Sequence, residues 1–141
     1  MKYEILEHPS ELRIRVYGKI LEELFSNAVL AMSKIFSSDA NILINANYTN
    51  REVIKIGSVD INSLLVDFLS EILAKSQISK KVYQVYKFTS FKFNDDEASL
   101  EVELIGHPAA HFDEDIKAVT YEDLDIKQID GIWQTVIVFD I

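Results

Sequence analysis

Two stretches of the chain place their apolar residues at the spacing of an amphipathic helix. The first covers residues 20–36, and no Ser, Thr or Asp stands at its start to cap it. The second has the clearer stripe, with Asp60 placed as its N-cap, and its apolar members are Ile61, Leu64, Leu65, Phe68, Leu69, Ile72 and Leu73. We interpret this second stripe as a core-packing face, and a groove-binding face for a partner is the less favoured alternative.

The remaining patterned segments alternate apolar and polar residues with a period of two, which is typical of strands. In the segment 12–17, Leu12, Ile14 and Val16 alternate with arginines and a tyrosine, which predicts one core face and one solvated face. Polar turns are expected at 8–11 and 94–97, and Asp130-Gly131 predicts a hairpin. The expected strands are 1–7, 12–17, 42–48, 52–56, 82–93, 99–105, 116–127 and 133–140. This order predicts an α+β fold, with mainly antiparallel sheet packed against two amphipathic helices.

Length and composition narrow the class of protein. A chain of 141 residues that is 48% hydrophobic is long enough for one compact core, so we expect a single domain over residues 1–141. The absence of cysteine excludes disulfides, thiolate metal ligands and thiol nucleophiles. No apolar stretch reaches the roughly 18 residues of a membrane span and no secretion signal is visible, so we expect a cytoplasmic protein. No feature of the sequence specifies an oligomeric state.

The charge balance argues against direct contact with nucleic acid. The formal net charge is −9 and the pI is near 4.7. Binding to phosphates requires clustered Lys and Arg. Any link to RNA is therefore expected to run through a protein partner.

Known catalytic signatures are missing from the sequence. It contains no phosphate-binding glycine loop and no G-x-S-x-G elbow, so nothing predicts a nucleotide pocket or a serine nucleophile. The histidines His8, His107 and His111 are expected on turns. The spacing of the last two suits zinc on one face of a helix, but Pro108 argues against a helix there.

Three charged residues stand at or within expected strand ends. Glu11 opens one strand, Lys117 interrupts an apolar run, and Asp140 closes the last strand. If the first and last strands are neighbours, Glu11 and Asp140 can share a divalent cation, either calcium or magnesium, to which Ile141 adds an oxygen. The alternative is a surface salt bridge of Lys117 with one acid, the second acid being solvated.

The chain resembles the archease family over nearly its full length. The resemblance is carried by "YEILEHPSELRIRVYGKILEELFSNAVLAM", "INSLLVDFLSEIL", "KAVTYEDL" and "IWQTVIVFDI", in the order and close to the spacing of the family. It implies a protein that is not itself an enzyme and that activates the GTP-dependent tRNA-splicing RNA ligase by helping the ligase form its guanylylated state. It also implies that the family's metal-site acids correspond to Glu11 and Asp140, and its functional lysine to Lys117.

The sequence departs from the family pattern at two places. Where the family usually has His-Thr-Ala-Asp, this chain has His8-Pro9-Ser10-Glu11, and Glu122 stands where a His usually follows the tyrosine. The Glu11 arm is one methylene longer, so its carboxylate must retract to hold the same ion. Glu122 removes a possible donor and adds a negative charge if that position faces the site.

The leading hypothesis is therefore a ligase activator whose acidic tip binds a divalent cation through Glu11 and Asp140, with Lys117 orienting the site or contacting the ligase. Two alternatives belong to other classes. One is a metal-assisted hydrolase that uses the same carboxylates. The other is an acidic, chaperone-like binding module without metal.

Overall fold

The structure is a computed structural model that describes residues 1–8, 11–37, 51–109 and 111–141. Its two helices are α1 (Leu21–Phe36) and α2 (Ile61–Ser79). Its strands are β1 (Tyr3–His8), β2 (Glu11–Gly18), β3 (Arg51–Ser58), β4 (Lys81–Phe93), β5 (Ala98–Pro108), β6 (Ala118–Thr120), β7 (Lys127–Ile129) and β8 (Ile132–Asp140). None of the helices described is long and apolar enough to cross a membrane.

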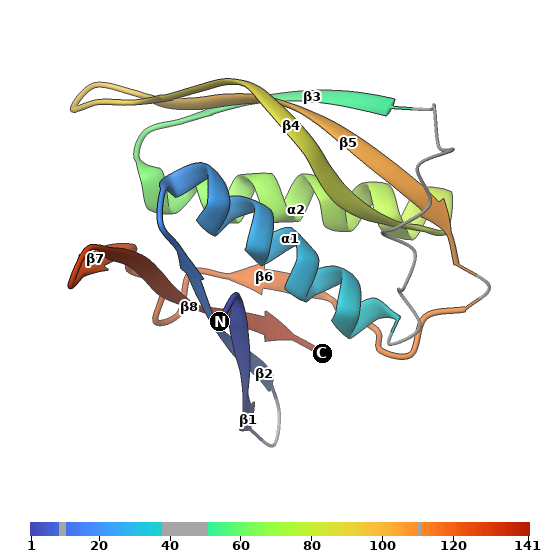
Figure 1. The fold of residues 1–141 in the computed structure, drawn as a ribbon. Coiled ribbons are helices and arrows are strands. Elements are labelled where there is room, and N and C mark those ends of the chain that lie inside the picture. The colour runs from blue at the N-terminus through green and yellow to red at the C-terminus, as the bar shows by residue number, and fades with distance from the viewer. Residues whose placement is uncertain (9–10, 38–50, 110) are drawn as a thin grey trace.

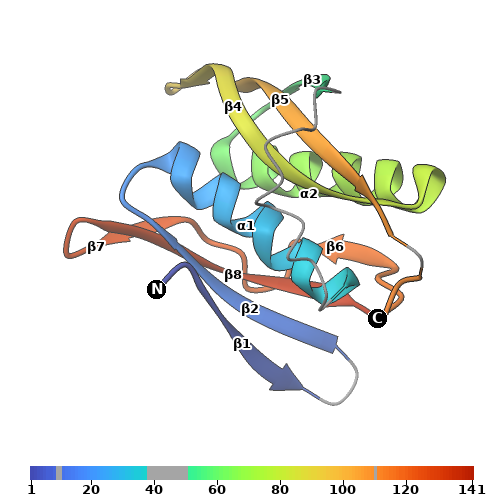
Figure 2. The same cartoon turned by 45° about the vertical axis from the view of Figure 1, so that its right-hand side comes forward.

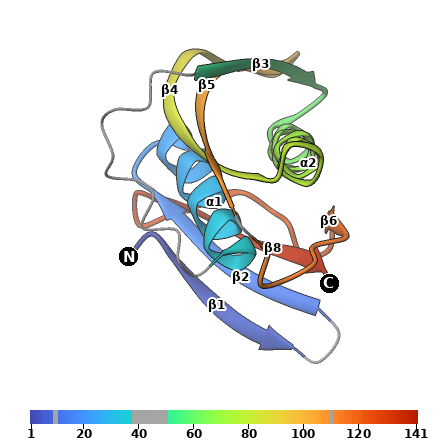
Figure 3. The same ribbon diagram turned by 90° about the vertical axis from the view of Figure 1, so that its right-hand side faces the viewer.

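The two helices lie between two antiparallel sheets (Figure 1). One sheet has the order β1-β2-β8-β6, with β7 also pairing with β8, and the other has the order β3-β5-β4. Figure 2 shows β1, β2 and β8 on one side of α1, with β3, β4 and β5 on the other side. In Figure 3, α2 is seen end-on beside α1 in the same middle layer. The predicted α+β class is confirmed.

The alternation in β2 separates core from surface. Ile14 and Val16 are fully buried beneath α1, whereas Arg13 and Arg15 project from the opposite face of the sheet. In β8, Ile137 pairs with Ile14, so apolar residues of both strands face the helices. The five-stranded sheet thus has one apolar face and one polar face.

A close approach of backbone fixes the step from β2 into α1. A Cβ at Gly18 would lie 2.3 Å from the Leu24 nitrogen, so only glycine allows the strand end to touch the first turn of the helix. The expected lack of a capping side chain at this helix start is confirmed. Asn27 ties the two elements together by donating a hydrogen bond to the Tyr17 carbonyl at 2.8 Å.

The second helix is capped and packed as its stripe predicts. The Asp60 carboxylate accepts a hydrogen bond from the Ser63 N–H at 2.7 Å, and the predicted apolar positions are buried. The helix extends to Ser79, beyond the last stripe residue, and Lys80 ends it in the left-handed conformation. The Phe68 ring packs on Phe25 of α1 at 5.8 Å between centroids, which joins the two helices.

Several predicted elements differ from the structure. The expected strand over 116–127 is wrong: β6 and β7 pair separately with β8, and residues 121–126 between them form no strand. The hairpin at Asp130-Gly131 is confirmed, and both residues have positive φ. His8 and His107 are strand residues, of β1 and β5, because both hairpin strands run longer than their apolar patterns. The expected strand over 42–48 lies outside the described residues.

A candidate metal and partner site at the paired ends of β2 and β8

Glu11 and Asp140 lie directly opposite each other on neighbouring strands. They are register partners in the antiparallel pair β2–β8. Side chains opposite each other in such a pair share one face of the sheet, with Cβ atoms about 4.5 to 5.5 Å apart. The neighbour of the last strand is therefore β2, while β1 lies at the outer edge. The Glu11 side chain is 18% exposed and Asp140 is exposed.

Lys117 joins the same strand end through its backbone. Its N–H donates a hydrogen bond to the Asp140 carbonyl at 2.7 Å, and the next residue, Ala118, is the register partner of Asp140. Lys117 therefore precedes β6, and its side chain is exposed. Within the described residues no ion pair joins Lys117 to Glu11 or Asp140. The three residues named from the sequence thus meet at one end of the sheet.

Sequence reasoning missed a fourth residue of this site, Arg13. Its Nη2 donates to the Glu11 carboxylate at 3.0 Å and to the Glu122 carboxylate at 3.2 Å, and its Nη1 donates to Asp123. The hydrogen bonds to Asp123 first and then to Glu11 raise the pKa of the Arg13 guanidinium above its ordinary value. The signal was present in the period-two pattern, because Arg13 stands two residues from Glu11 and so shares its face.

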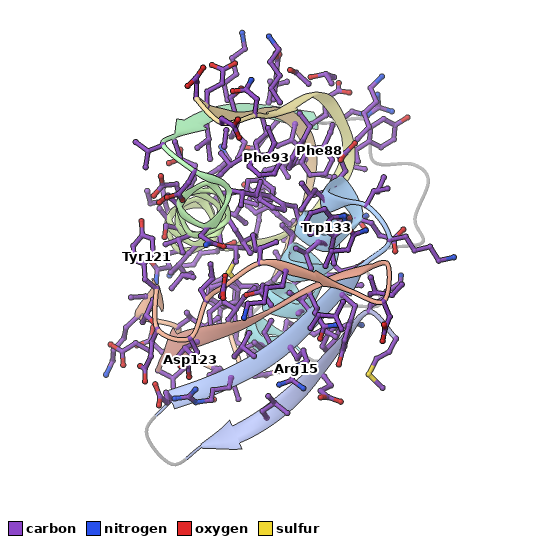
Figure 4. The ribbon with its side chains drawn as sticks, turned by 90° about the vertical axis from the view of Figure 1, so that its left-hand side faces the viewer. Arg15, Phe88, Phe93, Tyr121, Asp123 and Trp133 are labelled. Carbon is purple, nitrogen blue, oxygen red and sulfur yellow. The ribbon has the colours of Figure 1, made fainter. Side chains whose placement is uncertain are left out.

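Arg13 reaches the acids of the segment that follows β6. That segment is a turn in which the Leu124 N–H donates to the Tyr121 carbonyl at 3.1 Å, and Asp123 has a left-handed backbone. In Figure 4, Asp123 and Arg15 both lie along the sheet that contains β2, at separate places along it. Glu122 therefore faces the site through its contact with Arg13.

The contact also covers an apolar position on the outer face of the sheet. Val138 is the register partner of both Arg13 and Thr120, so it faces away from the helices, and yet it is fully buried. The aliphatic stem of an arginine shields such a residue from water while its charged head stays in contact with acids. Arg13 is thus held by packing as well as by charge.

The donor set suits a hard divalent cation. Within the described ranges no three His, Asp or Glu side chains gather closely enough to hold a metal by themselves. An ion held by Glu11 and Asp140 would have to take its remaining ligands from main-chain oxygens and water, which calcium and magnesium accept. The Ile141 side chain packs against the core, which places a main-chain oxygen next to Asp140.

The formal charges of the surrounding side chains point the same way. Glu11, Glu122, Asp123 and Asp140 carry four negative charges, against the two positive charges of Arg13 and Lys117. Acidic side chains therefore outnumber basic ones in this set.

His107 and His111 do not join this site. His107 lies on β5 in the other sheet, is 1% exposed, and its burial lowers the pKa of its imidazole. His111 is exposed and pairs with Asp113 at 3.2 Å. The zinc pair that their spacing allows has no helix to present it, as expected from Pro108.

A surface pocket of about 570 Å³ lies at the other end of β2. It is lined by residues around Tyr17, Gly18 and the start of α1. Seven residues of extended strand separate Glu11 from Gly18, which corresponds to roughly 20 Å. The acids of the candidate site do not line this pocket.

Comparison with known proteins identifies one family throughout. The family described as "Archease protein family (MTH1598/TM1083)" matches residues 3–141. A relative from Methanosarcina mazei named "Protein archease" is 35% identical over 144 residues, covering 99% of this chain and 96% of its own length. A relative of the same name from Pyrococcus furiosus is 30% identical, covering 99% of both chains.

Two solved structures share the fold. The solution structure of Methanobacterium thermoautotrophicum protein 1598 superposes with a TM-score of 0.81 at 25% identity, covering 99% of this chain and 98% of that chain. A crystal structure from Thermotoga maritima, described as an archease and possible chaperone, superposes with a TM-score of 0.57 at 18% identity, covering 96% and 94%.

Proposed function

This chain belongs to the archease family, and from that premise we propose that it is a non-enzymatic activator of a GTP-dependent tRNA-splicing RNA ligase. In this role it promotes guanylylation of the ligase and so allows multiple turnovers. The observation that carries the proposal is the pairing of Glu11 with Asp140 on adjacent strands, with Lys117 hydrogen-bonded to the same strand end.

The proposal assigns a role to each of these residues. Glu11, Asp140 and an oxygen of Ile141 hold calcium or magnesium, and Lys117 contacts the ligase close to its nucleotide-bearing pocket. A bound divalent ion would hold the two carboxylates together and present positive charge and open coordination positions to a partner's oxygen atoms. Lys117 is suited to an intermolecular contact because its ammonium group is exposed.

Two features favour an activator over a metal-assisted hydrolase. The carboxylates stand at the exposed end of a sheet, whereas hydrolytic sites enclose their substrate in a concave pocket that limits water. The pocket at the start of α1 lies roughly 20 Å away, at the far end of the same strand. The metal-free, chaperone-like module remains the second candidate, and it is favoured by the description of the Thermotoga maritima neighbour as a possible chaperone.

The test is a multiple-turnover ligation assay with purified ligase, GTP and a cleaved tRNA substrate. The wild-type chain should raise the number of turnovers per ligase, and it should increase the fraction of ligase that carries guanylate. Lys117→Ala should lose most of this stimulation, whereas Lys127→Ala should keep it, because Lys127 is an exposed lysine paired with Asp125 on the distant hairpin.

The same assay also tests the metal site. Asp140→Asn should lose stimulation and calcium binding together. Asp130→Asn removes the same charge at a turn whose left-handed backbone asparagine accepts, so it should retain both. Absence of stimulation at every ratio of the two proteins contradicts the proposal, and stimulation that survives in Asp140→Asn selects the metal-free module.

A further inference from the structure

The positively charged guanidinium of Arg13 pairs with Glu11, a carboxylate that the proposed metal site requires. Its guanidinium contacts Glu11 at 3.0 Å, and Glu11 is the register partner of Asp140. Both side chains of this ion pair are mostly shielded, at 21% and 18% exposure. A metal ion within ligand distance of Glu11 would lie about 5 Å from the guanidinium. Two cations would then share one carboxylate.

Arg13 has two other acidic partners that would hold its guanidinium if a metal ion bound Glu11. Glu122 lies 3.2 Å from Nη2, the nitrogen that also contacts Glu11, and Asp123 contacts the other nitrogen, Nη1, so two further carboxylates already hold the same guanidinium. Arg13 stands opposite the buried Val138 on the neighbouring strand. Arg13 can therefore give up Glu11 and remain paired.

One atom marks the strain in this arrangement. The Nε of Arg13 is buried and has no hydrogen-bond acceptor among the described residues. A guanidinium with five donors rarely leaves one buried donor without a partner. The side chain is thus spread among three carboxylates, and its geometry is not optimal for any single one.

We propose that Arg13 is a built-in competitor of the divalent cation: a metal ion binds Glu11 and Asp140 by taking Glu11 from the Arg13 guanidinium, which stays paired with Glu122 and Asp123. The inference rests on the proposed metal site and concerns its regulation. Arg13 sets the ion concentration at which the site fills, and Glu122 and Asp123 favour filling because they hold the displaced guanidinium. Metal binding thereby couples the end of β2 to the turn that follows β6.

A purely structural role predicts the opposite sign. If Arg13 only positions Glu11 as a ligand, its removal loosens Glu11 and weakens metal binding. If Arg13 competes, its removal strengthens metal binding. Coulomb's law for a divalent ion and one charge about 5 Å apart, in a water-like and screened environment, gives a change on the order of tenfold in affinity.

The experiment measures calcium and magnesium binding to the full chain by titration calorimetry. Arg13→Gln should bind calcium about tenfold more tightly than wild type. Arg15→Gln is the matched control, because Arg15 stands two residues along the same face and pairs only loosely with Glu4, at 3.9 Å. Its affinity should stay within about twofold of wild type, since a more distant exposed charge is screened.

A second variant tests the coupling without altering Arg13. The double change Glu122→Gln and Asp123→Asn leaves the guanidinium with Glu11 alone, so calcium should bind more weakly than in wild type. The double change Asp125→Asn and Asp130→Asn removes two exposed negative charges elsewhere and should have a smaller effect. This comparison keeps the proposal testable if Arg13→Gln does not fold.

A spectroscopic readout follows the guanidinium directly. The chain has three arginines, so nitrogen-15 labelling gives three Nε–H signals that single substitutions assign. Calcium should shift the Arg13 signal with the dissociation constant found by calorimetry, and the Arg15 and Arg51 signals should stay in place.

The outcomes separate the two proposals. Suppose that wild type binds calcium and Asp140→Asn does not, while Arg13→Gln binds calcium no more tightly than Arg15→Gln. The competitor role is then overturned and the metal site stands. If no variant binds either ion, both proposals are overturned. Binding that is detectable only in Arg13→Gln supports the competitor role and contradicts metal binding by the wild-type site at the concentrations tested.

Discussion

The junction between β2 and α1 allows the packing to be tested with a single methyl group. Gly18 ends the strand that carries Glu11 and Arg13, and a Cβ there would lie 2.3 Å from the Leu24 nitrogen and 2.8 Å from the Ile20 oxygen. Both neighbours are backbone atoms, so no side chain can rotate away. Ordinary contact begins near 3.4 Å, so α1 would have to move by about 1 Å relative to the strand.

We expect Gly18→Ala to destabilise the fold by about 3 kcal/mol, the upper end of the range for overpacking, because a whole helix must shift. For a domain of this size that corresponds to a fall of roughly 9 °C in Tm. Thermal unfolding followed by circular dichroism measures the change, and urea unfolding provides the free energy independently.

Gly57→Ala is the matched control. A Cβ at Gly57 meets nothing within 4 Å, and this glycine has no positive φ that would strain an alanine. Its stability should stay the same or rise by up to about 1 kcal/mol, because alanine restricts the unfolded chain. A Gly18→Ala protein that melts within about 2 °C of Gly57→Ala would refute the close-approach argument.

Three further predictions concern the site and the core. Calcium at about 100 times its dissociation constant should stabilise wild type by about 2.7 kcal/mol and Asp140→Ala hardly at all. Without metal, Asp140→Ala should melt at the same temperature as wild type or higher. Equal calcium-induced shifts of Tm in the two proteins would exclude Asp140 as a ligand. Burial holds the pKa of His107 below its ordinary 6.5, so the unfolded chain binds more protons than the folded one, and the free energy of unfolding should fall as pH drops from about 7.5 to 5.5. His107→Gln should reduce this fall, as measured by urea unfolding at each pH. An unchanged dependence of stability on pH in the variant would contradict the prediction. Asp60→Ala should cost about 1 kcal/mol in urea unfolding, because the Ser63 N–H loses its acceptor, whereas Asp60→Asn should cost much less.

The length of the Glu11 side chain has a physical consequence. A glutamate has one more methylene than an aspartate, and here its carboxylate is turned toward Arg13, two residues along the strand. The longer arm thus reaches a partner on its own strand while its Cα stays opposite Asp140. Glu11 and Glu122, the two positions at which the sequence resemblance led us to expect other residues, meet on one guanidinium.

Local patterns in the sequence determined the elements that depend on local physics. The stripe from Ile61 and the capping role of Asp60 were sufficient for α2, because helix spacing and N-capping act within a few residues. The alternation around Ile14 and the Asp130-Gly131 turn likewise predicted strands and a hairpin that the structure contains. The segment 116–127 failed because its polar residues interrupt the apolar run, and only pairing with β8 decides which parts become strand.

Identification of the candidate site required both the sequence and the tertiary structure. Sequence reasoning selected Glu11, Lys117 and Asp140 as charges at strand ends, but their meeting depends on strand order, which no local pattern contains. Tertiary structure alone decided that β2 lies beside β8, and that register puts Glu11 opposite Asp140. Arg13 was visible as an outward-facing arginine, yet its partners Glu122 and Asp123 are more than 100 residues away in sequence and become neighbours only when the turn after β6 folds over the sheet. Residue types and periodicity thus determine which side chains face water, whereas long-range strand pairing determines which of them meet.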